Sequence, residues 1–193
     1  MRIAFYTDPH LRSIGSYPPF NMIGSSGMSK ELENMISGFI FVANTLRDNP
    51  VDYVFCLGDV FHEIDRIPNS VLYGASHAFE HINKIIPPSK HHILVGNHDL
   101  TSTRNMVNSI RVLKGYGTPW CNSDILHLTK DSENIKVGVI PYGSTAEVYG
   151  SIYKMKDDVD FIVTHSECSG SHMENDQEVK DGVPSKVGVQ VFS

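Results

Sequence analysis

The sequence predicts an α/β protein, in which helices cover β-sheets. Short apolar runs of strand length alternate along the chain with segments whose apolar residues recur every three or four positions. Side chains that can bind a metal follow four of the strand-like runs directly, and ligand sites of layered α/β folds collect at this edge of a sheet. With 193 residues, 40% of them hydrophobic, the chain is large enough for one domain with its own core, and we expect residues 1–193 to form it.

The first helix is expected to begin at Ser29 and to end near Asn49. Between these residues the apolar side chains fall at three- and four-residue steps. Ser29 is a suitable N-cap, and the pair Asn49 and Pro50 stops a helix. A buried strand at Arg2–Thr7 precedes this helix, separated from it by a loop over 11–28 that is rich in glycine, serine and proline.

The later elements continue the alternation of strands and helices. One of the strands opens with His91 and His92, whose side chains we expect to be solvated. The expected elements after the first helix are a strand at 51–57, a helix at 70–85, and strands at 91–95, 135–142, 159–165 and 187–193.

Composition and charge limit the classes of function. The formal net charge is -6, so binding of nucleic acid by a basic surface alone is not favoured, although a bound cation would offset metal-binding carboxylates. The three cysteines match no zinc or redox spacing, which favours a reduced, cytoplasmic location. The N-terminal residues do not resemble a signal peptide and no apolar run reaches membrane-spanning length, so we expect no membrane as a partner.

Four short motifs carry the residues of a candidate site for two metal ions. They are D-P-H, G-D-V-F-H, G-N-H-D and T-H-S, and their side chains that suit a metal are Asp8, His10, Asp59, Asn97 and His165. Two cations about 3.5–4 Å apart need an anionic bridge, for which an aspartate is suited, and imidazoles and an amide oxygen complete the two sites. This mixture of nitrogen and oxygen ligands favours manganese, iron or zinc over calcium.

Each motif alone has a simpler interpretation. A D-x-H sequence after a strand is weak evidence, a G-D pair is most often a plain turn, and a single histidine such as His165 is usually a core residue. G-N-H-D is more specific. The occurrence of all four motifs in this order, each at the end of a predicted strand, favours the metal site.

The set D-x-H … G-D-x-x-H … G-N-H-D … H resembles the calcineurin-like metallophosphoesterase superfamily, over Asp8 to His165. Protein Ser/Thr phosphatases of this superfamily carry an arginine shortly after the aspartate of the second motif and a glutamate after G-N-H. This chain has G-D-V-F-H and G-N-H-D instead. It is therefore similar to the SbcD-like branch of DNA repair and recombination exonucleases, and also to the recombination endonuclease of tailed phages.

The resemblance implies a fold, an activity and partners. The fold is a four-layer α/β/β/α sandwich, in which two packed mixed β-sheets are flanked by helices. The activity is manganese-dependent cleavage of DNA phosphodiesters, by a hydroxide that bridges two metal ions. The partners are DNA and an ATPase subunit of the SMC-like type, and the family also implies a homodimer.

The resemblance also implies a role for each motif residue. The implied metal ligands are, in chain order, Asp8 and His10 for the first ion, Asp59 as the bridge, and Asn97 and His165 for the second ion. Two histidines would be catalytic without binding metal. His98 would face the phosphate and protonate or stabilise the leaving oxygen, and His62 would assist it.

Two alternatives to a DNA nuclease stay open. The first is a metallophosphatase that acts on phosphomonoesters. The second is an inactive fragment that lacks two metal ligands, because the family pattern includes a later G-H-x-H motif that does not occur between His165 and Ser193. We expect the domain to be truncated just before that motif, with V-G-V-Q-V-F-S as the strand that would precede it. We therefore expect these 193 residues to bind metal weakly and to cleave slowly or not at all.

Overall fold

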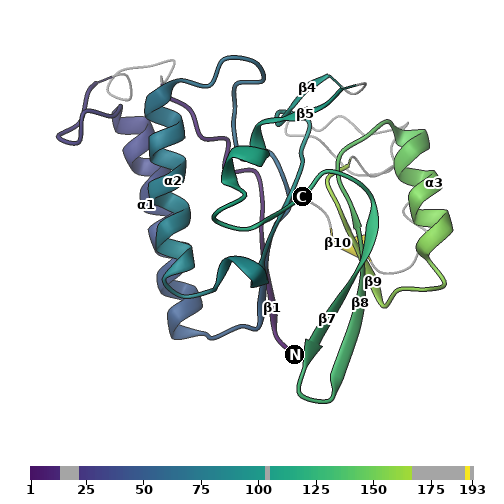
Figure 1. Cartoon of the computed structure of the whole chain (residues 1–193). Coiled ribbons are helices and arrows are strands. Elements are labelled where there is room, and N and C mark those ends of the chain that lie inside the picture. Colours follow the sequence, from purple (N-terminus) through teal and green to yellow (C-terminus); the bar gives the residue numbers. More distant parts are fainter. Residues whose placement is uncertain (14–21, 103–104, 167–189, 192–193) are drawn as a thin grey trace, which may run out of the picture.

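Two β-sheets pack face to face in the middle of the molecule, and helices cover both outer sides (Figure 1). The computed structural model describes residues 1–13, 22–102, 105–166 and 190–191. In Figure 1, α1 (Lys30–Asp48) and α2 (Asn69–Asn83) form one outer layer, and α3 (Thr145–Met155) forms the other. The predicted α/β class and the four-layer sandwich are confirmed.

The first sheet is wholly parallel in the described residues. Its strands, in spatial order, are β1 (Ile3–Tyr6), β2 (Tyr53–Cys56), β3 (His91–Leu94) and β6 (Thr118–Trp120). We expected this sheet to be mixed, but each connection returns the chain to the same edge, as parallel pairing requires. Strand β6 was not predicted from the sequence; its Pro119 cannot donate to a ladder and is tolerated because β6 lies at the edge.

Helices α1 and α2 cover the outer face of the first sheet. The hydroxyl of Ser29 accepts a hydrogen bond from the backbone N–H of Leu32 at 3.2 Å, so the predicted N-cap is confirmed. The apolar stripes of both helices pack onto the strands in a common core. The helix residues of this core include Leu32, Ile36, Phe39, Phe79 and Ile82.

The second sheet is mixed, as expected. Its spatial order is β10 (Gln190–Val191), β9 (Phe161–Thr164), β8 (Glu133–Ile140) and β7 (Asp124–Lys130), and only β7 runs antiparallel to its neighbour. Helix α3 covers its outer face through Val148 and Ile152. Ser144 and Glu147 form a capping box at the start of α3.

The inner faces of the two sheets share one apolar core. Phe55, Leu57 and Leu94 from the first sheet meet side chains from β7, β8 and β9, namely Leu128, Val137, Val139 and Val163. Because strand β2 is covered by helices on one side and by a sheet on the other, both of its faces are largely apolar. This explains why the sequence shows β2 as a continuous apolar run.

The prediction that His91 and His92 are solvated is wrong. Their exposed fractions are 0% and 4%, because β3 is an inner strand with both faces covered. Tyr6 Oη lies 2.9 Å from His91 Nε2, and Trp120 Nε1 donates to His92 Nδ1 at 3.1 Å. Burial lowers the pKa of both imidazoles to about 4, so both are neutral near pH 7.

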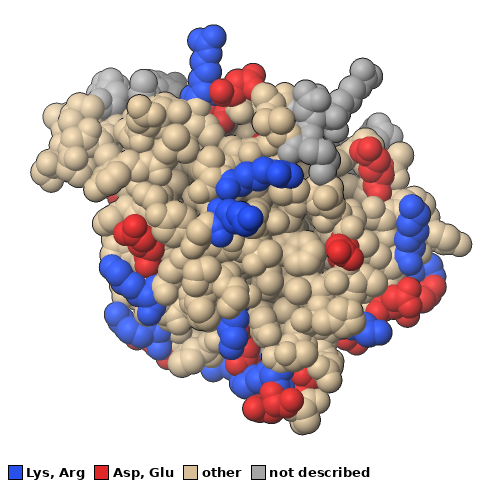
Figure 2. All heavy atoms as spheres, in the orientation of Figure 1, with Lys and Arg blue, Asp and Glu red and all other residues tan. Residues whose placement is uncertain are grey.

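Shorter elements flank strand β3 and connect it to β6 within the first sheet. They are the hairpin of β4 (Leu100–Ser102) and β5 (Asn105–Asn108) and two 3₁₀ turns, η1 (Pro88–Lys90) and η2 (Ser109–Leu113). On the face of the molecule seen in Figure 2, basic and acidic side chains are interspersed over the surface. In the described part of the chain, no helix has both the length and the apolar character needed to cross a membrane.

Candidate metal centre

Four loops at the carboxyl ends of strands carry the predicted site residues. Asp8 follows β1, Asp59 follows β2, Asn97 follows β3 and His165 follows β9. Backbone hydrogen bonds join the first two loops, since His10 N–H donates to the carbonyl of Asp59 at 3.0 Å. The two loops therefore run side by side, which places the D-P-H and G-D-V-F-H motifs together.

The backbone is strained at three of these residues. Asp8, His10 and Asp59 have φ values of 51°, 43° and 52°, in the left-handed region that side chains rarely adopt. Such conformations cost free energy and cluster at functional sites. Each of these residues lies in the loop that directly follows its strand.

Two glycines allow the loops to approach each other closely. A Cβ atom on Gly96 would lie 2.0 Å from Asp59 Oδ1, and one on Gly58 would lie 2.7 Å from His165 Nδ1. Gly58 also has a φ of 116°, which favours glycine for a second reason. The glycines before Asp59 and Asn97 are thus required for the packing of the site.

Asp59 lies at the centre of the group, and its exposed fraction is 3%. Its Oδ2 lies 3.5 Å from His10 Nε2, and its Oδ1 lies 3.6 Å from His165 Nε2. One carboxylate thus presents one oxygen to each of two imidazoles from different loops. Ligand atoms of Asp8, Asp59 and His165 all lie within 4.8 Å of one another, a spacing that suits a shared cation.

The tautomer of His165 can be inferred from its contacts. Its Nδ1 lies 2.9 Å from the carbonyl oxygen of Leu57, which can only accept, so Nδ1 donates to it. Its Nε2 lies 2.9 Å from Asn97 Oδ1, so the imidazole nitrogen and the amide oxygen face each other. A metal ion ligated by both atoms is compatible with this contact, and so is an amide turned to donate its NH2 to Nε2. The residues present therefore fit a metal ion.

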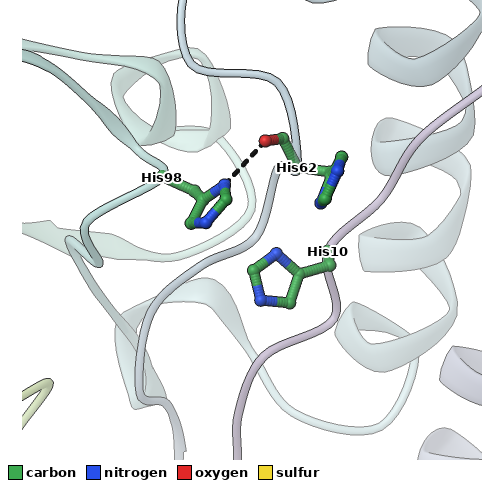
Figure 3. A group of neighbouring side chains, drawn as sticks. All are labelled: His10, His62 and His98. Carbon is green, nitrogen blue, oxygen red and sulfur yellow. Dashed lines mark hydrogen bonds between the residues drawn. The ribbon is translucent and has the colours of Figure 1, made fainter. Parts of the chain in front are cut away.

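A second group of candidate ligands consists of three histidines (Figure 3). The rings of His10, His62 and His98 face one another, with centroids 4.8–5.5 Å apart. His98 Nδ1 donates to the backbone carbonyl of His62 at 2.7 Å, which leaves its Nε2 for the site. Among the described residues, the buried Nδ1 of His10 has no hydrogen-bond partner. Burial lowers the pKa of His10, although Asp59 opposes this effect, so the ring is available as a neutral ligand.

Asp99 is a site residue to which no role was assigned from the sequence. Its exposed fraction is 1%, and its carboxylate accepts from Gly96 N–H at 2.9 Å, Phe61 N–H at 3.3 Å and Val60 N–H at 3.4 Å. Burial raises its pKa to about 6, and the charge of Asp59 acts in the same direction. Asp99 thus binds the loop after β2 to the loop after β3. The signal in the sequence that could have indicated this role is the position of Asp99 as the last residue of the G-N-H-D motif.

Comparison with known proteins agrees with this arrangement. A family model described as calcineurin-like phosphoesterase matches residues 1–191. The chain belongs to the calcineurin-like phosphoesterase family. No curated protein matches the chain.

Membership of this family gives the general chemistry of the phosphoesterase. It is a metal-dependent hydrolase of phosphoesters, and two divalent metals are general in the family. The phosphoesterase carries two candidate ligand groups that meet at His10 and Asp59, 3.5 Å apart. All seven sequence-predicted site residues come from loops of this one region.

Proposed function

We propose that the phosphoesterase is a nuclease that cleaves DNA phosphodiester bonds with two Mn²⁺ ions. The first ion would be held by Asp8 and His10, and the second by Asn97 and His165. Asp59 would contact both, which the 3.5 Å and 3.6 Å separations of its two oxygens from His10 and His165 support. Two cations held there supply an acidified water and stabilise negative charge on the phosphoryl oxygens.

His98 is proposed to protonate or stabilise the leaving oxygen, with His62 assisting it. The hydrogen bond from His98 Nδ1 to the carbonyl of His62 fixes the ring and directs Nε2 away from that loop. The backbone N–H of His98 also donates to Asp59 Oδ1 at 2.9 Å. This position beside the bridging carboxylate suits a group that transfers a proton to a phosphoester oxygen.

The side chains around His10 favour a diester substrate. A phosphomonoester dianion has more charge to neutralise than a diester, and a bidentate arginine suits it. The titratable groups that act on His10 are Asp59, His98, Asp8 and His62, and no lysine or arginine of the described residues is among them. The lack of such a fixed cation beside His10 favours a singly charged diester, and a histidine can supply the proton that its alkoxide leaving group needs.

Substrate comparison tests this proposal. The chain is incubated with Mn²⁺ and, separately, bis(p-nitrophenyl) phosphate, p-nitrophenyl phosphate or linear duplex DNA, with Asp59→Asn as the inactive control. We expect slow turnover of the diester and slow cleavage of DNA, without turnover of the monoester. Turnover of the monoester alone would overturn the nuclease in favour of a phosphatase, and no turnover with bound Mn²⁺ would favour the inactive fragment.

We also propose that the nuclease works with an SMC-like ATPase subunit and as a homodimer. The support is the resemblance of G-D-V-F-H and G-N-H-D to the SbcD-like exonuclease branch. Sedimentation of the purified chain tests the dimer, and a monomer at all concentrations would contradict it.

A further inference from the structure

A pocket of about 560 Å³ lies at the free edge of the first sheet, apart from the residues of the metal centre. Pockets for small ligands commonly have volumes of about 300–1,000 Å³. Side chains from η2, β6 and the start of β7 line it, among them Arg111, Lys114, Trp120, Cys121, Asn122 and Asp124. It is thus large enough for a ligand of nucleotide size.

Two basic side chains are among those that line the pocket. Arg111 lies in η2 and Lys114 follows it directly, and both are exposed. Among the described residues, no carboxylate forms an ion pair with either of them. The two cations therefore have the capacity to bind an anion, and a phosphate is the anion that an arginine and a lysine commonly share.

Trp120 provides an apolar surface in the pocket, and its ring is held in place. Its Nε1 donates to His92 Nδ1 at 3.1 Å inside the molecule, and its carbonyl accepts from Val95 N–H at 3.2 Å. With its polar edge bound to the interior, the ring contributes apolar surface to the pocket. A fixed aromatic ring on which a flat base can stack is typical of sites for single-stranded nucleic acid.

Two segments that line the pocket, η2 and β6, are hydrogen-bonded to residues of the G-N-H-D motif or directly before it. Ser109, the first residue of η2, donates its N–H to the carbonyl of Asp99 at 2.9 Å. Val95, which bonds to Trp120, directly precedes Gly96 of the same motif. Backbone hydrogen bonds therefore link the segments that line the pocket to the loop that carries Asn97 and His98.

We propose that this pocket binds one nucleotide unit, with its phosphate at Arg111 and Lys114 and its base against Trp120. Asp124 and the Asn122 amide can accept or donate hydrogen bonds at the edge of a base, and Asp124 reduces the net charge of the wall to one positive charge. The choice of a nucleic-acid strand as the source of this unit rests on the proposed nuclease function. The strand would be held here while another of its phosphates is at the metals.

Tryptophan fluorescence tests the pocket directly, because Trp120 is the only tryptophan of the chain. The measurement is made in EDTA, so that metal binding and cleavage play no part. Thymidine 5′-monophosphate, a short oligothymidylate and inorganic phosphate are titrated separately. We expect saturable quenching by both thymidine ligands. Tighter binding of the oligonucleotide identifies a strand as the source, and tighter binding of the mononucleotide overturns that part of the proposal.

Matched variants distinguish binding in this pocket from a general attraction of anions to positive charge on the protein surface. The double substitution Arg111→Ala and Lys114→Ala removes both cations and should weaken binding of the oligonucleotide about tenfold or more. Trp120→Ala, measured by calorimetry, should weaken it by about the same factor, since the stacking of a base on an aromatic ring has this magnitude. Trp120→Phe should retain most of the affinity. The control pair, Arg47→Ala and Lys154→Ala, removes the same charge from exposed positions of α1 and α3.

Two results would overturn the pocket as a nucleotide site. One is the absence of saturable quenching, and the other is an equal loss of affinity in the control pair. Failure of DNA cleavage with retained quenching would instead count against the proposed nuclease and leave the nucleotide site standing. The two proposals can therefore fail separately.

Discussion

Asn97 Oδ1 lies 2.9 Å from His165 Nε2, while Nδ1 of the same imidazole is held by the carbonyl of Leu57. The two facing atoms come from different sheets, since Asn97 follows β3 and His165 follows β9. A cation ligated by both would therefore join the two sheets of the sandwich. Metal binding should accordingly stabilise the whole fold and not only the loops.

Substitution of the central carboxylate should remove metal binding. Asp59→Asn keeps the shape of the side chain and an acceptor for His98 N–H, but it removes the negative charge that faces His10 and His165. We expect the affinity for Mn²⁺ to fall by more than the roughly 10–100-fold typical of outer-shell changes. Calorimetric titration with Mn²⁺ measures it.

The control for this experiment is Asp157→Asn, which removes the same charge at an exposed position beside Lys156. It should leave the Mn²⁺ affinity unchanged. Equal affinities of Asp59→Asn and the unmodified chain would rule out Asp59 as a bridge.

Addition of one methyl group at Gly96 should disrupt the site. The Cβ atom of Gly96→Ala would lie 2.0 Å from Asp59 Oδ1 and 2.3 Å from its backbone nitrogen, so the two loops must separate. We expect a loss of Mn²⁺ binding together with lower stability, measured by calorimetry and by urea unfolding. Gly38→Ala is the matched control, because this exposed glycine of α1 has no atom within 4 Å of the added Cβ. It should raise stability by about 0.5–1 kcal/mol, and unaltered Mn²⁺ affinity in Gly96→Ala would contradict the prediction.

Asp99 should support the site without binding metal. Asp99→Asn presents an amide to the backbone N–H groups of Gly96, Phe61 and Val60, which leaves part of this buried network unsatisfied. We expect the free energy of unfolding to fall by about 1–3 kcal/mol, and the affinity for Mn²⁺ to fall less than in Asp59→Asn. Urea unfolding and calorimetry measure the two effects. An Asp99→Asn protein with full stability would show that these hydrogen bonds contribute little.

Stability should decrease as the pH falls from about 6.5 towards 4. Burial lowers the pKa of His91 and His92 from the ordinary value of 6.5 to about 4. The unfolded chain therefore binds more protons than the folded chain in this range, so the stabilising contribution is complete above pH 6.5 and is lost on acidification. Each histidine can contribute up to about 1.4 kcal/mol per pH unit. Asp99 opposes one of the two histidines below about pH 6, because burial raises its pKa in the folded chain to about 6. Urea midpoints at pH 7.5, 6 and 5 measure the trend, which His92→Phe should make shallower; equal midpoints would contradict it.

The arrangement of the metal-ligand candidates was predictable because it depends on strand ends. A run such as Tyr53–Cys56 is recognisable by its apolar residues, and parallel strands bring the residues that follow them to one edge. The cap at Ser29 was predictable for a similar reason, since its chemistry is local.

Other features depend on contacts that no local pattern reveals. His91 and His92 are polar, so their burial follows only from the position of β3 between two neighbours and two layers. Helix α3 was missed because only Val148 and Ile152 are its buried residues, which makes a weak periodic signal. The role of Asp99 required knowledge of which backbone N–H groups two separate loops present to it.

The left-handed backbone of Asp8, His10 and Asp59 bears on how this enzyme could be engineered. Each such residue costs roughly 1–2 kcal/mol relative to a residue free to adopt the conformation. A screen that rewards heat resistance alone would favour glycine at these positions. It would relieve the backbone strain, but it would also remove the candidate metal-binding side chains. Selection for a more thermostable variant should therefore keep these three residues fixed and vary the helix surfaces away from the site.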